Sequence, residues 1–325
     1  MAVTHPTWPA TGYAGAMRSW AAAAALLAFS CSKSKPTDDP VPEPSLESRP
    51  LPTADATTEP PVPEHTMFPS AAAAFEAILA TNPTVIGLGE YHQTRDAAHI
   101  ESAIARFDAE LLDMLGDITS DLVLETYISE GKCGEAERVV SQKVPETTER
   151  PETTESEISR LIGHARALGI EPHILRMRCQ DFETIVVQGE VDFDKLLVWV
   201  TGELARVCNS IVEYRRGRGM QAKDHDAKRA TIAVYSGAHH NNLSPAGDMD
   251  ELSYVSKIAA AIGDGYVEVD LYVPEFVRGK STALAEPWYP LIERAAPDRV
   301  MLIERAPRSY IILLQRDRVA SNARK

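Results

Sequence analysis

The sequence predicts an α/β fold, a three-layer sandwich with a mostly parallel or mixed central sheet. Short apolar runs rich in β-branched residues alternate with longer amphipathic stretches, as strands and helices do in such folds. The runs are continuously apolar, which is typical of strands covered by helices on both faces. With 44% hydrophobic and 25% charged residues, the composition excludes a wholly disordered chain, a collagen-like repeat and a disulfide-dense miniprotein.

Residues 67–325, about 260 residues, are predicted to form one domain. Its expected strands are Thr84–Gly89, Asp121–Glu125, Glu171–Met177, Thr231–Gly237, Val267–Val273, Val300–Ile303 and Tyr310–Leu314. Its expected helices are Ala71–Ala80, Arg95–Leu115, Glu155–Leu168, Asp194–Tyr214 and Glu251–Ile262. The low-complexity segment Pro145–Glu155 (PETTERPETTE) interrupts this alternation, and we expect an exposed acidic loop there.

The N-terminus predicts a secretory leader that ends at Cys31. Residues 1–30 carry one charged side chain, Arg18, before an apolar run too short to span roughly 30 Å of hydrocarbon. The segment LAFSC, ending at Cys31, resembles a bacterial lipobox, so residues 1–31 are expected to end at a lipidated cysteine; plain secretion is the alternative. The chain would then be anchored in the cell envelope, and Ser32 favours the outer membrane by the same resemblance. The true start, Met1 or Met17, stays open.

Residues 32–66 predict a disordered stalk between this anchor and the domain. They contain nine of the 22 prolines and seven acidic residues, with too little apolar surface to bury. The whole chain has a formal net charge of -14, which argues against nucleic acid as a partner because a phosphate backbone attracts net positive charge.

Three cysteines remain after Cys31, namely Cys133, Cys179 and Cys208, and they show no metal-binding spacing. We expect them to be buried small hydrophobic residues. One disulfide is an alternative, but the sequence does not select the pair.

Polar residues follow several predicted strands, at the edge where open α/β sheets bind ligands. Glu90 and His92 follow the first strand, with His99 seven residues beyond His92; if the intervening segment is helical, the two histidines share a face. Glu125 ends the second strand. The fourth strand runs into Gly237-Ala238-His239-His240, which places two more histidines at the same edge.

The spacing Gly-x-x-His occurs twice, at Gly89–His92 and at Gly237–His240. Two imidazoles with a glutamate suit a divalent metal that keeps an open position, and without a metal they supply a general acid–base pair. The expected metal ligands are Glu90, His92 and His240, and the expected catalytic residues are Glu90, His92, Glu125 and His240. The wider cofactor-binding set is Glu90, His92, His99, His239 and His240. Capping, core packing and surface roles are the structural alternatives, for His99 above all.

Taken together, the segment VIGLGEYH ending at His92, LVLE ending at Glu125 and SGAHH ending at His240 resemble the ChaN/Tiki/erythromycin-esterase-type superfamily. The resemblance covers roughly residues 70–315. Carried over, Glu90 and His92 match its GExH motif, Glu125 its second-strand acid, and His240 its late GxxH.

This resemblance implies several functions. ChaN-type members are lipoproteins implicated in haem binding, Tiki-type members are metal-dependent proteases, and the esterase branch uses Glu and His to hydrolyse lactones. The leading expectation is a lipoprotein that binds haem or a divalent metal in the Glu/His cleft. The alternative is a metal-dependent or Glu/His general-base hydrolase, a peptidase or an esterase, and a catalytically silent interaction domain is the third possibility. The expected partners are the membrane, through the lipid anchor, and a small-molecule or peptide ligand.

Overall fold

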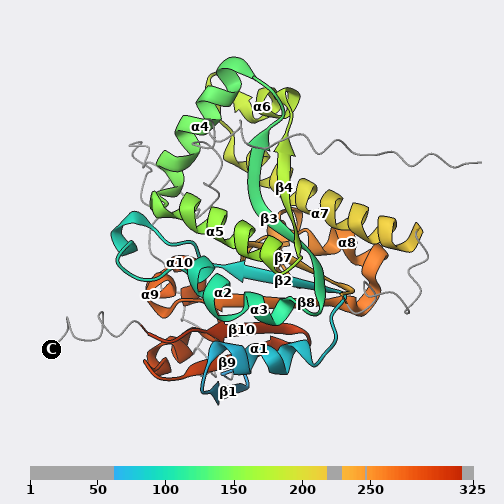
Figure 1. The fold of residues 1–325 in the computed structure, drawn as a ribbon. Coiled ribbons are helices and arrows are strands. Elements are labelled where there is room, and N and C mark those ends of the chain that lie inside the picture. The colour runs from blue at the N-terminus through green and yellow to red at the C-terminus, as the bar shows by residue number, and fades with distance from the viewer. Residues whose placement is uncertain (1–61, 218–228, 246, 317–325) are drawn as a thin grey trace, which may run out of the picture.

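The computed structural model describes residues 62–217, 229–245 and 247–316. The expected leader, Cys31 and most of the expected stalk lie outside the described residues. The described chain folds around a sheet of eight strands in the order β1-β9-β10-β8-β2-β7-β3-β4, with helices on both sides (Figure 1). The predicted α/β three-layer fold is confirmed.

Six neighbouring strands, from β10 to β4, run parallel, whereas β9 is antiparallel to both of its neighbours. The sheet is therefore mixed, with its antiparallel part at one edge. The strands are β1 (His65–Phe68), β2 (Val85–Glu90), β3 (Thr119–Ser129), β4 (Glu171–Met177), β7 (Thr231–Gly237), β8 (Tyr266–Tyr272), β9 (Val300–Ala306) and β10 (Ser309–Leu313), and a separate small hairpin contains β5 (Val186–Val187) and β6 (Glu190–Val191).

Each face of the sheet carries its own apolar core. One core packs side chains of β2, β7 and β8 against α1 (Ala71–Leu79), α2 (Ala103–Glu110), α3 (Leu112–Leu115) and α5 (Thr153–Ala167). The other packs the opposite side chains against α7 (Phe193–Gly217), α8 (Val255–Ile262) and α6 (Cys179–Ile185). A third cluster joins β9 and β10 to α9 (Pro274–Val277) and α10 (Ser281–Leu284).

All seven predicted strands are present, but several segments differ from the sequence prediction, and the helices α4 (Gly134–Thr148), α6, α9 and α10 were not predicted. The helix expected over Arg95–Leu115 is broken into the 3-10 turn η2 (Arg95–Ala97), α2 and α3. The edge strand β1 begins at His65, within the last residues of the expected stalk.

The segment Pro145–Glu155 is not an exposed loop. Its first half completes α4 (Gly134–Thr148), its second half begins α5, and Thr148, Pro151 and Thr154 are buried. The repeated PETTE sequence therefore forms the end of α4, the start of α5 and the turn between them.

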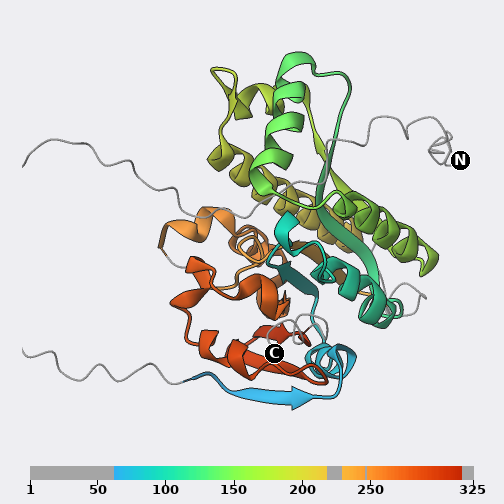
Figure 2. The ribbon, with the colours of Figure 1, turned by 90° about the vertical axis from the view of Figure 1, so that its left-hand side faces the viewer.

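A disulfide joins Cys133 to Cys179, and Cys208 is free and buried. The expectation of three buried thiols is therefore wrong for two of them. The bond ties the N-terminus of α4 to the start of α6, within a lobe made of α4, α6 and the β5–β6 hairpin. Figure 2 shows α4 and the segment after β4 projecting above the rest of the molecule.

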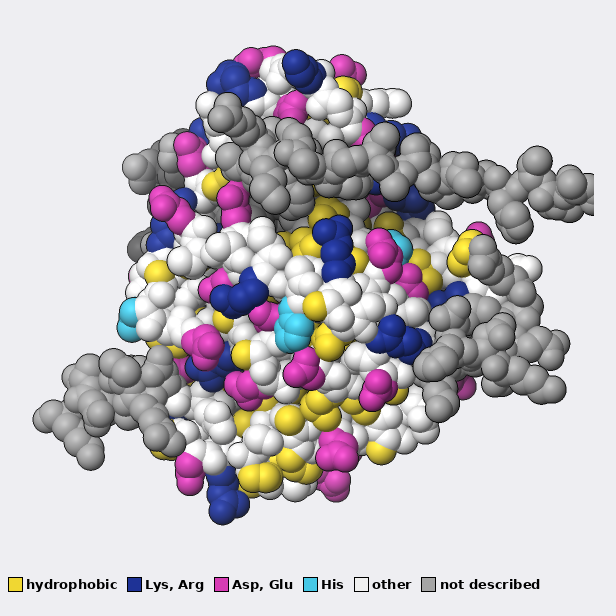
Figure 3. Space-filling model, in the orientation of Figure 1, with side chains coloured by type: hydrophobic (Ala, Val, Ile, Leu, Met, Phe, Trp, Pro, Cys, Tyr) yellow, Lys and Arg dark blue, Asp and Glu magenta, His cyan; other side chains and the backbone are white. Residues whose placement is uncertain are grey.

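The surface in Figure 3 shows acidic and basic side chains interspersed over the face drawn. The excess of acidic residues does not gather into one patch on this face. Among the described residues, no helix is both long and apolar enough to cross a membrane.

Candidate active site

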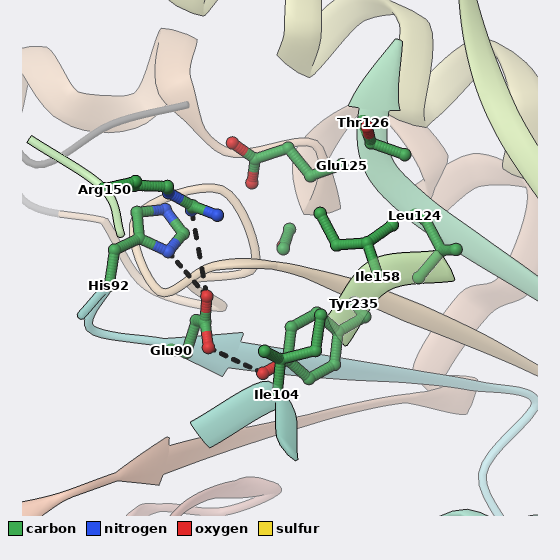
Figure 4. Close-up of a pocket in the computed structure, with 10 residues that line it drawn as sticks. Glu90, His92, Ile104, Leu124, Glu125, Thr126, Arg150, Ile158 and Tyr235 are labelled. Atoms are coloured by element: carbon green, nitrogen blue, oxygen red, sulfur yellow. Dashed lines mark hydrogen bonds and ion pairs between the residues drawn. The ribbon is translucent and has the colours of Figure 1, made fainter. Parts of the chain in front are cut away.

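A pocket opens at the carboxyl ends of β2, β7 and β3, where the sequence predicted a ligand site. The register brings the strand ends together, because Glu90 pairs with Gly237 and Leu124 pairs with Tyr235. The pocket is small, with a cavity volume of about 20 Å³, which is room for about one water molecule. Its lining combines charged, polar and apolar side chains: Glu90, His92, Ile104, Leu124, Glu125, Thr126, Arg150, Ile158, Tyr235 and Ser236 (Figure 4).

Glu90 and His92 form a buried pair on the floor of this pocket. Each is 6% exposed, and His92 Nδ1 lies 2.7 Å from Glu90 Oε1. The hydroxyl of Tyr235 donates to the other carboxylate oxygen, Oε2, at 2.7 Å. Because an ionised carboxylate can only accept, the hydrogen of His92 is on Nδ1 and its lone pair is on Nε2. His92 Nε2 has no hydrogen-bond partner among the described residues.

The electrostatics of the pair favour a charged glutamate beside a neutral histidine. Burial raises the pKa of Glu90, but the hydrogen bond and charge of His92, the charge of Arg150 and the hydroxyl of Tyr235 together bring that pKa below its ordinary value. Burial, followed by the charge of Arg150, lowers the pKa of His92 and outweighs the opposite effect of Glu90. At neutral pH the imidazole therefore keeps its basic lone pair.

Arg150 reaches the pocket from the turn between α4 and α5. Its Nη2 lies 3.8 Å from Glu90 Oε1, and its side chain is 10% exposed. Figure 4 shows it running alongside His92. The sequence analysis missed this residue; the signal was one arginine standing between two copies of an acidic repeat.

Glu125 and His240 form the opposite side of the site. Glu125 Oε2 accepts the backbone N–H of Gly237 at 2.5 Å, and its Oε1 lies 3.7 Å from His240 Nε2. His240 Nδ1 lies 2.9 Å from the carbonyl oxygen of Leu252, so Nδ1 carries a hydrogen. When the imidazole is neutral, Nε2 is an acceptor like Glu125 Oε1, and a donor such as water or a substrate O–H or N–H suits the space beside them.

The two pairs meet over Gly237. A Cβ built on this glycine would lie 3.0 Å from His92 Nε2 and 3.6 Å from Glu125 Oε2. The missing side chain leaves room for both groups to approach one small volume.

Two of the expected cofactor residues lie elsewhere. His99 follows η2 and is exposed, and no helix places it on a face with His92. His239 is also exposed and packs edge-on against the ring of Tyr91, with centroids 6.3 Å apart. Neither lines the pocket around Glu90 and His92.

The expected metal set does not form a coordination sphere in this arrangement. Glu90 lies behind His92, bound to Nδ1 and to Tyr235, and does not face the free Nε2. Within the described ranges, no group of three or more His, Cys, Asp or Glu side chains is placed to hold a metal ion. These residues do not fit a metal as placed, and binding of haem or metal stays a prediction.

Comparison with known proteins shows no family for this chain. No family model and no solved structure matches it. A stretch of 87 residues is 33% identical to deoxyribose-phosphate aldolase of Agrobacterium fabrum, and the match covers 26% of this chain and 30% of the aldolase. The chain thus spans less than a third of that curated protein, and the match is too partial to assign an activity.

Proposed function

We propose that the protein is a hydrolase in which His92 acts as the general base that activates water. The observation that carries the proposal is the state of the His92 imidazole. Its Nδ1 is held by the buried Glu90 carboxylate, while its Nε2 is basic, unpartnered among the described residues and adjacent to a pocket. A carboxylate that holds one nitrogen of a neutral imidazole leaves the other ready to accept a proton.

In the proposed reaction, the attacking water gives a proton to His92 Nε2 as its oxygen bonds to a substrate carbonyl carbon. The imidazolium that forms is stabilised by Glu90, and it returns the proton to the leaving group when the tetrahedral intermediate breaks down. Glu125 and His240 supply acceptors that can hold the hydrogens of the water or of the leaving group. The substrate class is a carbonyl compound, an ester, lactone or amide.

The proposal is tested with His92→Gln and with His99→Gln as the matched control, since His99 is exposed and outside the pocket. The probes are p-nitrophenyl acetate, p-nitrophenyl butyrate and fluorescently quenched casein. Loss of a general base costs about 10²-fold or more in kcat/KM. We expect that loss on at least one probe for His92→Gln and an unchanged rate for His99→Gln.

The pH dependence gives a second readout. Because the pKa of His92 is lowered, the basic form persists below the usual range of histidine, and the midpoint of the rise in kcat/KM with pH should lie below about pH 6.5. Hydrolysis that survives His92→Gln, or no hydrolysis of any probe by the unmodified chain, contradicts the proposal.

A further inference from the structure

Arg150 belongs to a turn that is fastened to the loop carrying the proposed base. α4 is followed by its cap residue Glu149, which adopts a left-handed conformation with φ of 50°, and α5 begins four residues after Glu149. Such a conformation is unfavourable for a residue with a Cβ and persists where surrounding contacts hold it. The chain direction changes there, and Arg150 is the next residue.

The contacts that hold the turn come from Arg95, three residues after His92. Its backbone N–H donates to the carbonyl of Glu149 at 2.8 Å. Its guanidinium donates from Nη2 to the carbonyl of Pro145 at 3.0 Å and from Nε to the carbonyl of Arg150 at 3.3 Å. The loop after β2 therefore presents His92 and, through Arg95, also fixes the backbone of Arg150.

The charge of the pocket indicates what Arg150 can bind. Two carboxylates, Glu90 and Glu125, line it with one guanidinium. An anionic substrate group would meet an excess of negative charge in a poorly solvated site, which is costly. The oxygen of a neutral carbonyl brings no charge on binding, and it develops negative charge only as water attacks.

We propose that Arg150, positioned by Arg95, binds the carbonyl oxygen of a neutral ester, lactone or amide and stabilises the oxyanion formed on it. This inference rests on the proposed hydrolase function. As the water oxygen bonds to the carbonyl carbon, the π electron pair moves to the oxygen facing Arg150, and the proton moves to His92. The oxyanion and the imidazolium form together, so the net charge of the pocket does not change during this step. When the tetrahedral intermediate breaks down, the electron pair on the oxyanion re-forms the carbonyl, and the leaving group departs with the proton from His92.

The main test compares Arg150→Met and Arg150→Lys with Arg138→Met, a control on the exposed part of α4. A donor aimed at a developing oxyanion contributes about 10²–10³-fold to kcat. For Arg150→Met we expect a loss of about 10²-fold in kcat with little change in KM, on whichever neutral probe the unmodified chain hydrolyses. Arg150→Lys keeps the charge but loses the planar guanidinium, so its kcat should lie between that of the unmodified chain and that of Arg150→Met. The anionic p-nitrophenyl hemisuccinate should be a poorer substrate than the acetate.

The second readout does not need activity. Arg150 lowers the pKa of His92, so Arg150→Met should raise the pKa read from the His92 Hε1 resonance, while Arg138→Met should leave it in place. Arg95→Met should shift this pKa in the same direction, because it releases the turn. An unchanged His92 pKa in both Arg150→Met and Arg95→Met overturns the inference.

The outcomes also separate this inference from the proposed function. If Arg150→Met retains kcat while His92→Gln abolishes it, the role of Arg150 is wrong and the hydrolase stands. If His92→Gln retains activity, the hydrolase proposal fails, and the oxyanion role fails with it even where the titration shift is seen.

Discussion

Two buried clusters of charged side chains lie on opposite faces of β2, and only one of them lines the pocket. The open cluster consists of Glu90, His92, Arg150 and Tyr235. The closed cluster consists of Asn241, Glu268, Asp270, Tyr272 and Arg305. Gly87 and Gly89 face the closed cluster, because they pair with Glu268 and Asp270 of β8, whereas Glu90 lies on the other face.

The closed cluster is compensated from within. Arg305 Nη2 lies 2.8 Å from Glu268 Oε1 and 2.7 Å from Asp270 Oδ2, and both carboxylates are 1% exposed. Tyr272 and Asn241 also donate to Asp270, at 2.8 Å and 3.2 Å. In the open cluster, by contrast, the charged Glu90 orients a neutral base whose outer nitrogen faces the pocket. Buried charge is therefore common to both clusters, and the proposed reactive site differs by having a basic atom beside a pocket.

The largest effect is expected for Arg305→Met, which leaves two buried carboxylates without their cation. Removal of one partner from a buried ion pair costs about 3–5 kcal/mol. We expect a loss of this size in the free energy of unfolding at pH 8, with a smaller loss at pH 5, where a carboxylate can take up a proton. Urea denaturation measures it, with the exposed Arg299→Met as control. Equal losses for the two variants would show that the closed cluster is not held by Arg305.

Glu268→Gln should change how stability depends on pH. Burial, with a further contribution from Asp270, raises the pKa of Glu268 to about 7 despite Arg305. A carboxyl whose folded pKa exceeds the unfolded value contributes stability below pH 4.5 and loses it as pH rises through 7. From pH 4.5 to 7.5 the variant should therefore gain roughly 3 kcal/mol relative to the unmodified chain. Parallel curves of unfolding free energy against pH would contradict the raised pKa.

Two glycine-to-alanine substitutions, each adding one methyl group, should affect the two clusters differently. A Cβ on Gly89 would overlap Asp270 Oδ1 and lie 2.6 Å from Asn241 Oδ1, so Gly89→Ala should destabilise the fold by about 2 kcal/mol. A Cβ on Gly237 would point at His92 Nε2, so Gly237→Ala should change stability by less than about 1 kcal/mol but reduce hydrolysis. Thermal unfolding and the ester assay, run on both variants, measure the contrast. If Gly89→Ala reduced hydrolysis and Gly237→Ala reduced stability, the proposed position of the reacting groups beside Gly237 would be contradicted.

The sequence allowed the sheet to be predicted because its central strands are long apolar runs. β1 escaped prediction because HTMF is a short edge strand in a polar, proline-rich context, paired only through β9. Glu90, His92, Glu125 and His240 could be placed at one edge because parallel strands end on the same side of a sheet.

Other parts of the site depend on packing between distant segments. Arg150 is brought to Glu90 from 60 positions away by the α4–α5 turn, which composition alone presented as an acidic loop. The exposed position of His99 follows from a break in the expected helix. Local periodicity contains neither contact, and the arginine between the two PETTE copies was a signal for Arg150 only in hindsight.

The Cys133–Cys179 bond has a consequence for chain connectivity. It closes a covalent ring across 46 positions, and that ring contains α4, the turn bearing Arg150, and α5. A protease that cuts once at the exposed Glu152 would leave a single covalent molecule under oxidising conditions. The proposed base, His92, and His240 on the opposite side of the site would then lie on two chain segments joined covalently only through the disulfide, which a reductant would break.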